Sequence, residues 1–506
     1  HGDGAAGDNI YGAQIPAQSL GSKIAYSISA TYTDGTSTVL ESAGNYTTTS
    51  PLSITPGALP KALTSTGYNQ SLGASGGTAP YTWSVVSGSL PPGITLGSAG
   101  MLTGTATAAG TYQFTASVAD SGGHTAANSF TLTSSVPPNV VIILTDDQGW
   151  GDIGCHTAPG QVPISTPNMD GIRANGIRLE KFYATAVCSV TRAALLTGRN
   201  TIRTGVNNSR GLDLSEHIMP QSFKAAGYQT FICGKWHLGG VLNNTNQTTV
   251  NGNRIAIVQE GLQYAPHNRG WDYHKGTYTG SINYFTHISS EPELVNQLDW
   301  WENGQLVNET TDLQGNGGYS TDLLADKAVE LIQRRDPSKP FLLYLPFNAM
   351  HTQVSAPQSY LNKYSAISDP LRRTIAAAVE CMDDGIGRVM RALDGEGVTN
   401  NTILLFMSDN GGDEQYGAVN DPLRGTKGDG YDGGIHTPAA IRFPNGLAAG
   451  ITSNQYVWVG DIFPTLCGAT GVTPQNTKPF DGINLWPALQ SITPGNPDGM
   501  ALSLIH

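Results

Sequence analysis

The side chains best suited to chemistry in this sequence come directly after apolar runs. Asp146 and Asp147 follow the run NVVIILT, and Asp409 and Asn410 follow the run TILLFMS. If they converge, the carboxylates repel one another by about 1–4 kcal/mol per pair at about 4 Å, so a cation must accompany them. Oxygen ligands without Cys or His are typical of hard ions such as Ca²⁺ and Mg²⁺. One Asp-Asp pair is common on protein surfaces, but two pairs that follow buried strands favour a metal site.

Four basic side chains occupy similar places next to apolar runs. Lys235 and His237 follow TFICG, His351 follows FLLYLPFNAM, and Lys427 lies in the glycine-rich loop RGTKGDGYDGG before the last run. Ligands of open α/β sheets bind beyond the carboxyl ends of the strands, so we expect these groups at the same edge as the carboxylates. Core histidines bonded to backbone and surface lysines are the commoner alternatives. We interpret five further histidines of this part as structural: His156, His217, His267, His274 and His287.

A nucleophile is suggested by Cys188, which opens the segment CSVTRAALLTGR where a helix is expected to begin. A Cys at a helix N-terminus, with Arg192 one turn further on, has a depressed pKa and lies where anions bind. By spacing alone, a buried helix-cap Cys beside a surface Arg is the commoner arrangement. The other cysteines fit neither a zinc site nor a dense disulfide framework and are expected to be plain thiols: Cys155, Cys233, Cys381 and Cys467.

The elements that must position these residues are strands and helices in alternation. Continuous apolar runs are typical of strands that are covered on both faces, and the patterns between them are helical. The sequence therefore predicts an α/β fold with a largely parallel central sheet flanked by helices. The runs are residues 139–145, 230–233, 341–347, 402–407 and 439–443, and the clearest helical patterns are 321–334 and 371–393.

The composition changes near residue 138, which divides the chain into domains. Alternating strand patterns before it predict the tail of a β-sandwich module at 1–50 and an immunoglobulin-like β-sandwich at 51–136, similar to modules of bacterial surface and secreted proteins. Residues 139–501 form the predicted catalytic domain, which we expect to be incomplete at its C-terminus. The last residues, LSLIH at 502–506, resemble translated sequencing-adapter sequence.

Charge and hydropathy exclude two classes of partner. The 506 residues carry a net charge of -12, with a pI near 5.3, which argues against nonspecific nucleic-acid binding. An anionic substrate must then be attracted by a local basic pocket. No stretch reaches the roughly 18 apolar residues that a membrane span requires.

Five motifs in order resemble those of the sulfatase family. CSVTRAALLTGR is similar to the family's first signature and GKWHLG to its second, and RGWDYHKGTYTGSINYFTH, MSDNGG and LRGTKGDGYDGGIHTPAAIRFP match in the same order. The resemblance covers about residues 139–489. It implies an alkaline-phosphatase-like fold.

The resemblance implies a modified nucleophile and a calcium ion. In sulfatases the motif Cys, here Cys188, is oxidised to formylglycine by a maturation enzyme, and the aldehyde hydrates to a diol. One hydroxyl attacks sulfur and the alcohol leaves, and the second hydroxyl then expels sulfate. Asp146, Asp147, Asp409 and Asn410 would hold Ca²⁺ as a Lewis acid, and Asp409 would also accept a diol proton.

The resemblance also assigns the basic residues. Arg192 and Lys235 would stabilise the alkoxide of the diol, and His237 would help to deprotonate the second hydroxyl. His351 and Lys427 would hold the sulfate and neutralise the leaving oxygen.

Two positions depart from the family pattern. Val190 stands where Pro or Ala is usual, and the maturation enzyme reads that position, so the sequence leaves the conversion of Cys188 open. His436 stands where an Arg is expected, which predicts altered packing or substrate preference without loss of chemistry.

The leading hypothesis is a secreted, periplasmic or cell-surface bacterial sulfatase that acts on sulfated polysaccharide or oligosaccharide. One alternative is a phosphodiester or phosphonate monoester hydrolase of the same superfamily. Another is a silent sulfated-glycan-binding protein, in which Cys188 stays unmodified. Loops such as residues 238–268 are expected to set specificity, and the pair Trp300-Trp301 could stack on a sugar or pack in the core.

Overall fold

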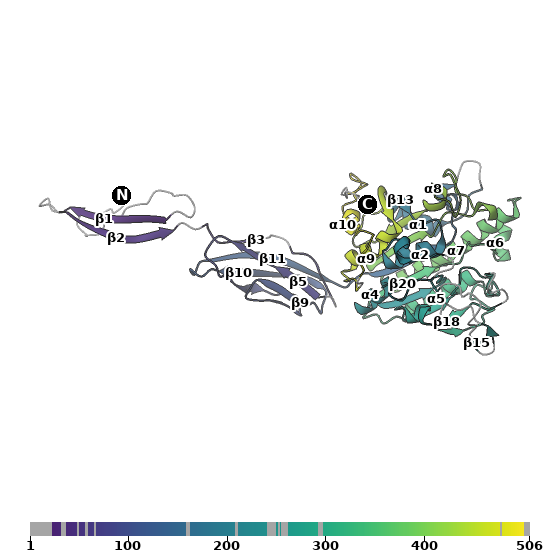
Figure 1. Ribbon diagram of the computed structural model, residues 1–506, viewed down its shortest axis with the longest axis horizontal. Helices are drawn as coiled ribbons and strands as arrows, with labels where there is room; N and C mark the ends of the chain where they lie inside the picture. The colour runs from purple at the N-terminus through teal and green to yellow at the C-terminus, as the bar shows by residue number, and fades with distance from the viewer. Residues whose placement is uncertain are drawn as a thin grey trace. The chain divides into compact units, whose positions relative to one another are not determined.

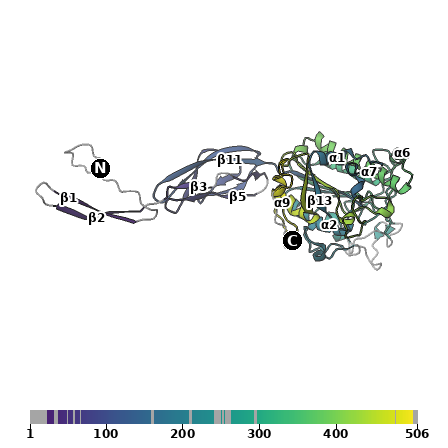
Figure 2. The same cartoon turned by 90° about the horizontal axis from the view of Figure 1, so that it is seen from above.

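The computed structural model divides the chain into two compact units, His1–Val136 and Pro137–His506 (Figures 1 and 2). The residues described are 23–31, 37–47, 50–55, 59–64, 67–157, 162–207, 211–239, 249–250, 253–254, 262–291, 297–475 and 478–499. The adapter-like residues 502–506 lie outside this set, as does most of the expected specificity loop at 238–268.

The first unit contains only strands among its described residues. β1 (Lys23–Thr31) and β2 (Ser37–Thr47) pair as an antiparallel hairpin. In the following segment, Phe114 and Trp83 from one sheet share a core with Leu102 and Tyr68 from another, which makes this segment a β-sandwich. Its strands are β3 (Ser53–Thr55), β4 (Ala62–Leu63), β5 (Gly67–Ser71), β6 (Gly73–Ser75), β7 (Thr82–Gly88), β8 (Ile94–Leu96), β9 (Met101–Thr105), β10 (Gly110–Ala119) and β11 (Thr125–Ser135).

A ten-stranded sheet with the order β19-β18-β17-β14-β20-β12-β21-β22-β13-β23 forms the centre of the second unit. The five strands from β17 to β21 in this order are parallel. The predicted α/β fold with a largely parallel sheet is therefore confirmed. The strands are β12 (Asn139–Thr145), β13 (Ile177–Tyr183), β14 (Gln229–Cys233), β17 (Tyr273–Gly276), β18 (Trp301–Glu302), β19 (Gln305–Leu306), β20 (Phe341–Pro346), β21 (Thr402–Ser408), β22 (Ala439–Arg442) and β23 (Ile451–Trp458), and β15 (Thr249–Val250) and β16 (Asn253–Arg254) form a separate pair.

Helices cover both faces of the sheet, which explains why its central strands are apolar throughout. On β12, Val140, Ile142 and Leu144 enter one core and Val141 and Ile143 enter the other. The first core is covered by α2 (Cys188–Thr197), α4 (Met219–Ala225), α9 (Ile462–Thr470) and α10 (Trp486–Gln490), and the second by α1 (Pro167–Ala174), α5 (Ser320–Arg334) and α7 (Pro370–Gly395). The short helices α3 (Thr201–Thr204), α6 (Gln358–Lys363) and α8 (Asp432–Ile435) lie in connections.

One antiparallel strand decides which loops reach the edge of the sheet where the parallel strands end. β22 runs antiparallel to β21, and its first residue, Ala439, pairs with Met407 near the end of β21. The segment that precedes β22, with Lys427, therefore lies at the same edge as the segment that follows β21, with Asp409. A parallel β22 would have placed Lys427 at the opposite edge.

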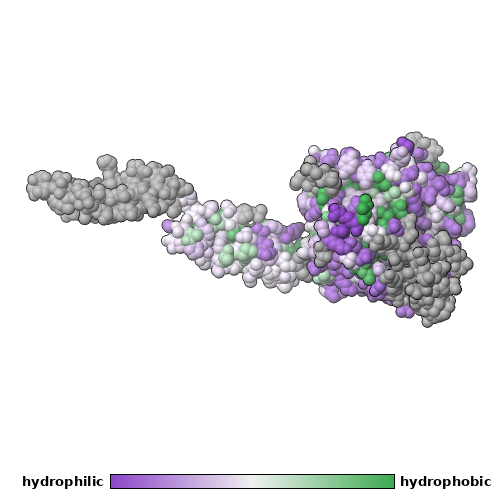
Figure 3. Space-filling model, in the orientation of Figure 1, coloured by the Kyte–Doolittle hydropathy of each residue, from purple (hydrophilic) through white to green (hydrophobic). Residues whose placement is uncertain are grey.

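Much of the described surface of the second unit is polar. Hydrophilic residues cover much of the face of the second unit seen in Figure 3, with small hydrophobic areas between them. None of the helices among the described residues has both the length and the apolar character needed to cross a lipid bilayer.

Candidate active site

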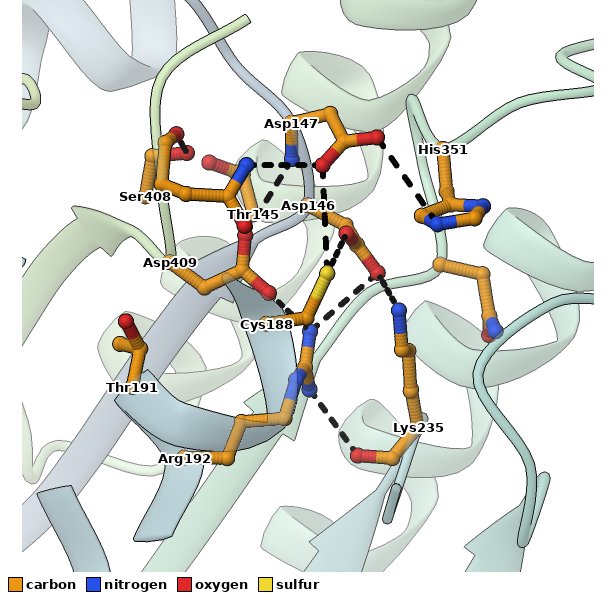
Figure 4. Close-up of polar contacts among 12 residues, drawn as sticks. Thr145, Asp146, Asp147, Cys188, Thr191, Arg192, Lys235, His351, Ser408 and Asp409 are labelled. Atoms are coloured by element: carbon orange, nitrogen blue, oxygen red, sulfur yellow. Dashed lines mark hydrogen bonds and ion pairs between the residues drawn. The ribbon is translucent and has the colours of Figure 1, made fainter. Parts of the chain in front are cut away.

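The four predicted metal ligands come together where two neighbouring strands end. β12 and β21 are parallel, with Thr145 opposite Ser408. Asp146 and Asp147 therefore leave the sheet beside Asp409 (Figure 4), and Asn410 follows Asp409 in the chain. The backbone N–H of Asp147 donates to Asp409 Oδ1 at 3.3 Å, and Asn410 Nδ2 donates to Asp147 Oδ1 at 2.8 Å. Asp147 has a φ of 58°, a left-handed conformation that Asp tolerates better than most residues.

Two buried cations lie against Asp146. Arg192, on α2, approaches Asp146 Oδ2 at 3.3 Å and Asp409 Oδ2 at 2.8 Å, and it donates to the carbonyl of Lys235 at 3.1 Å. Lys235 Nζ lies 2.5 Å from Asp146 Oδ2. Burial lowers the pKa of both cations, but the Asp409 carboxylate beside Arg192 and the Asp146 carboxylate beside Lys235 outweigh it, so both pKa values are raised. Both side chains are therefore held charged.

The third cation, Lys427, lies against the other carboxylate of the first pair. Its Nζ is 2.7 Å from Asp147 Oδ2, and His351 Nε2 is 3.9 Å from the same oxygen. Burial raises the pKa of Asp147, but His351 and Lys427 more than compensate and the net pKa is lowered. Burial and the neighbouring Asp146 raise the pKa of Asp409. Arg192, Lys235 and Lys427 balance the three acids, so the convergence of the carboxylates does not by itself require a metal ion.

The arrangement nevertheless fits a hard cation. Asn410 Oδ1 is buried and has no hydrogen-bond partner among the described residues. Asp146, Asp147, Cys188 and His351 each offer one potential metal-ligand atom, and these four atoms lie within 4.8 Å of one another. Because thiols and imidazoles are poor ligands for Ca²⁺, the oxygen donors are the better ligand set, and the unpaired amide oxygen of Asn410 adds one more.

Cys188 begins α2, and its Sγ lies above the first carboxylate pair. Sγ is 3.5 Å from Asp146 Oδ1 and 4.0 Å from Asp147 Oδ1. Burial and the charges of Asp146 and Asp409 raise the pKa of the thiol well above its ordinary value. The depressed pKa expected from the sequence is therefore wrong, because the thiol is buried beside two carboxylates.

The two predicted histidines have different surroundings. Burial and the charge of Lys235 lower the pKa of His237 well below its ordinary value, and its Nδ1 has no partner among the described residues. Its φ is 52°. His351 Nδ1 lies 2.7 Å from the carbonyl of Thr352, so this nitrogen is the donor and Nε2 is left facing Asp147. Burial also lowers the pKa of His351.

A pocket of about 310 Å³ opens over this cluster. Of the predicted residues it is lined by Cys188, His237, His351 and Lys427, while Arg192, Lys235, Asp146 and Asp409 are buried beneath. Other residues that line the pocket were not predicted from the sequence. Only Ser281 lies within one of the five family motifs. The remaining lining residues are Val187, Ser290, Glu291, Thr352, Gln353 and Tyr416.

The structure also shows the surroundings of His436 and of the pair Trp300-Trp301. His436 packs between Trp150 and Tyr183, with ring centroids 4.5 and 4.9 Å away, and its Nε2 lies 2.6 Å from the carbonyl of Glu180. The unusual residue is thus accommodated by ring packing. Trp300 and Trp301 are fully buried, which excludes a sugar platform and makes them core residues.

Comparisons with known proteins agree with this geometry. Residues 138–472 match the family model described as Sulfatase, and residues 51–135 match that of an Ig domain. The chain is 33% identical over 357 residues to arylsulfatase J of Mus musculus, covering 69% of this chain and 55% of that protein. It is 31% identical over 374 residues to N-acetylgalactosamine-6-sulfatase of Mus musculus, covering 70% and 66%. The chain thus spans between about half and two thirds of these relatives.

Among solved structures, the crystal structure of Ps i-CgsB in complex with k-i-k-neocarrahexaose matches with a TM-score of 0.61 and 28% sequence identity. The match covers 70% of this chain and 76% of that chain.

Proposed function

Since the chain belongs to the sulfatase family, we propose that it hydrolyses sulfate esters in the pocket above Asp146 and Asp147. The observation that carries the proposal is the meeting of three kinds of group in one pocket. Cys188 would supply the nucleophile, Lys427 and His351 would form a basic wall, and the carboxylates would hold a cation. This is the local basic pocket that an anionic substrate of an acidic protein requires.

Two groups would complete the site. Cys188 would be converted to formylglycine by a maturation enzyme, so its thiol stands in for the hydrated aldehyde that supplies the hydroxyl nucleophile. Asp146, Asp147, Asp409 and Asn410 would hold Ca²⁺, which polarises a sulfate oxygen as a Lewis acid when bound. The convergence of these four residues and the unpaired Asn410 Oδ1 support this assignment.

The chain's own residues would bind the ester and manage protons. Arg192 and Lys235 are buried and held charged beneath Cys188, so they would stabilise negative charge on the nucleophile oxygen. His237 would remove a proton from the second hydroxyl. Lys427 would bind the sulfate. Because Nδ1 of His351 donates to a carbonyl, Nε2 must first gain a proton, and the resulting imidazolium would then donate to the leaving oxygen.

We further propose a sulfated saccharide as substrate and a bacterial location outside the cytoplasm. The names of the matched N-acetylgalactosamine-6-sulfatase and the carbohydrate-bound Ps i-CgsB structure support a carbohydrate. The Ig-like module before the hydrolase domain supports a surface or secreted protein that meets polymers.

The test is to express the chain with and without a formylglycine-generating enzyme and to weigh the tryptic peptide of residues 182–192. Loss of sulfur and gain of a carbonyl oxygen at Cys188, together with release of sulfate from nitrophenyl sulfate, is the expected result. The matched control is Cys188→Ala, which removes the site of conversion. Faster hydrolysis of a phosphodiester analogue would favour the phosphodiester alternative. Binding of sulfated glycan without sulfate release, even after conversion, would overturn hydrolysis in favour of binding.

A further inference from the structure

Glu291 is a carboxylate in the wall of a pocket that is otherwise suited to anions. We propose that Glu291 selects sulfate esters on neutral sugar rings, by accepting hydrogen bonds from ring hydroxyls and repelling a second anionic group. The inference rests on the proposed sulfate-ester site and names a residue that limits its substrates.

The position of Glu291 is defined by Gly280 and by its own loop. A Cβ atom on Gly280 would lie 2.6 Å from Glu291 Oε1 and 2.8 Å from His237 Nε2, so both side chains border one point over this glycine. The backbone of the loop is held by bonds from Glu291 N to Ser289 Oγ at 3.2 Å and from Ser290 N to the carbonyl of Ser281 at 3.1 Å. Glu291 therefore belongs to an anchored wall beside His237.

The carboxylate of Glu291 is available to a ligand. It is partly exposed, and no hydrogen bond or ion pair to it is found among the residues that the structure describes. The lysines that line or underlie the pocket are bound elsewhere, Lys427 to Asp147 and Lys235 to Asp146. An ionised carboxylate only accepts hydrogen bonds, so it needs a donor from the substrate.

Neutral sugar rings supply such donors and suit the rest of the wall. Their hydroxyls donate to a carboxylate, and the amide of Gln353 offers both a donor and an acceptor nearby in the same lining. The Tyr416 ring, 40% exposed, offers a flat apolar face on which a ring can stack. A plain aryl sulfate has no hydroxyl for Glu291, and a second sulfate or a carboxylate would meet a like charge.

The test compares the wild type with Glu291→Gln on three esters: nitrophenyl sulfate, a monosulfated galactose disaccharide, and its disulfated form. We expect the variant to lose about tenfold or more in kcat/KM on the monosulfated sugar and to gain about tenfold on the disulfated one, relative to the wild type. On nitrophenyl sulfate the change should stay within about twofold. Glu396→Gln removes a charge at the end of α7, on the same unit, and should change none of the three values.

Each other result overturns the inference in a recognisable way. An equal loss on all three esters would mean that Glu291 acts through His237, and no change would mean that it has no role. If the wild type hydrolyses none of them, the proposed hydrolysis fails. Calorimetric binding of the two disaccharides then decides the inference separately. A preference for the monosulfated form that Glu291→Gln abolishes would support it, and binding without discrimination would refute it.

Discussion

Lys427 competes with the proposed calcium ion for Asp147, so its removal should tighten calcium binding. Lys427 Nζ lies 2.7 Å from Asp147 Oδ2, and the two side chains are only 19% and 2% exposed. A charge-assisted bond of this kind contributes about 1.5–3 kcal/mol, which a calcium ion must replace if it displaces the ammonium. If the ammonium stays in place, its positive charge repels the calcium ion. The lost bond and the repulsion both weaken calcium binding. We therefore expect Lys427→Met to lower the Kd for Ca²⁺ by about 10- to 100-fold.

The assay is calorimetric titration of Ca²⁺ into chelator-treated protein made without the maturation enzyme, so that no turnover interferes. Lys363→Met is the matched control, because Lys363 is 47% exposed and pairs with Glu380 at the surface. Its calcium affinity should equal that of the wild type. Weaker or unchanged binding in Lys427→Met would refute the competition, and no binding in any variant would remove calcium from the proposed site.

Three further outcomes are expected. His274 is fully buried, and burial lowers its pKa to about 3, below the ordinary 6.5, so its contribution to stability is present above pH 6.5 and is lost as the pH falls. Urea unfolding at pH 7.5 and 4.5 should show that His274→Phe reduces the acid-induced loss of unfolding free energy by about 3 kcal/mol. An unchanged loss would contradict the burial argument. Gly280→Ala should lower kcat/KM about tenfold or more in steady-state assays, because its Cβ would meet His237 and Glu291, with little change in Tm. Val190→Ala should raise the converted fraction of Cys188, measured by peptide mass. Equal fractions in the two proteins would contradict the expectation that Val190 hinders conversion.

The sequence predicted the sheet because its central strands are buried on both faces. The run NVVIILT coincides with β12 (Asn139–Thr145), and the predicted helices at 321–334 and 371–393 lie within α5 and α7. Polar residues that follow such runs must emerge at one edge, which is why Asp146 and Asp409 meet. The direction of β22 was not predictable, because the short segment AAIR does not encode it. Yet that direction brings Lys427 to the site.

Charge pairing and the pocket wall could not be predicted for a different reason. Spacing places Arg192 one turn after Cys188, but the guanidinium turns toward Asp146 and Asp409, and the pKa of the thiol rises instead of falling. Glu291 comes from a loop without a motif, so only the fold, which brings it into the pocket lining beside Gly280, reveals it. These are properties of three-dimensional packing between distant segments.

The balance of charges in the site connects the metal proposal with the substrate proposal. Three carboxylates face the three cations Arg192, Lys235 and Lys427, so their charges cancel. A bound divalent ion would therefore leave the site with a net positive charge. That excess can attract an anion to a protein whose net charge is -12. A single sulfate ester leaves the site still positive, and a second anionic group would gain from the same excess. Glu291 opposes that gain at the wall, so a pocket built to attract negative charge can still reject substrates that carry too much of it.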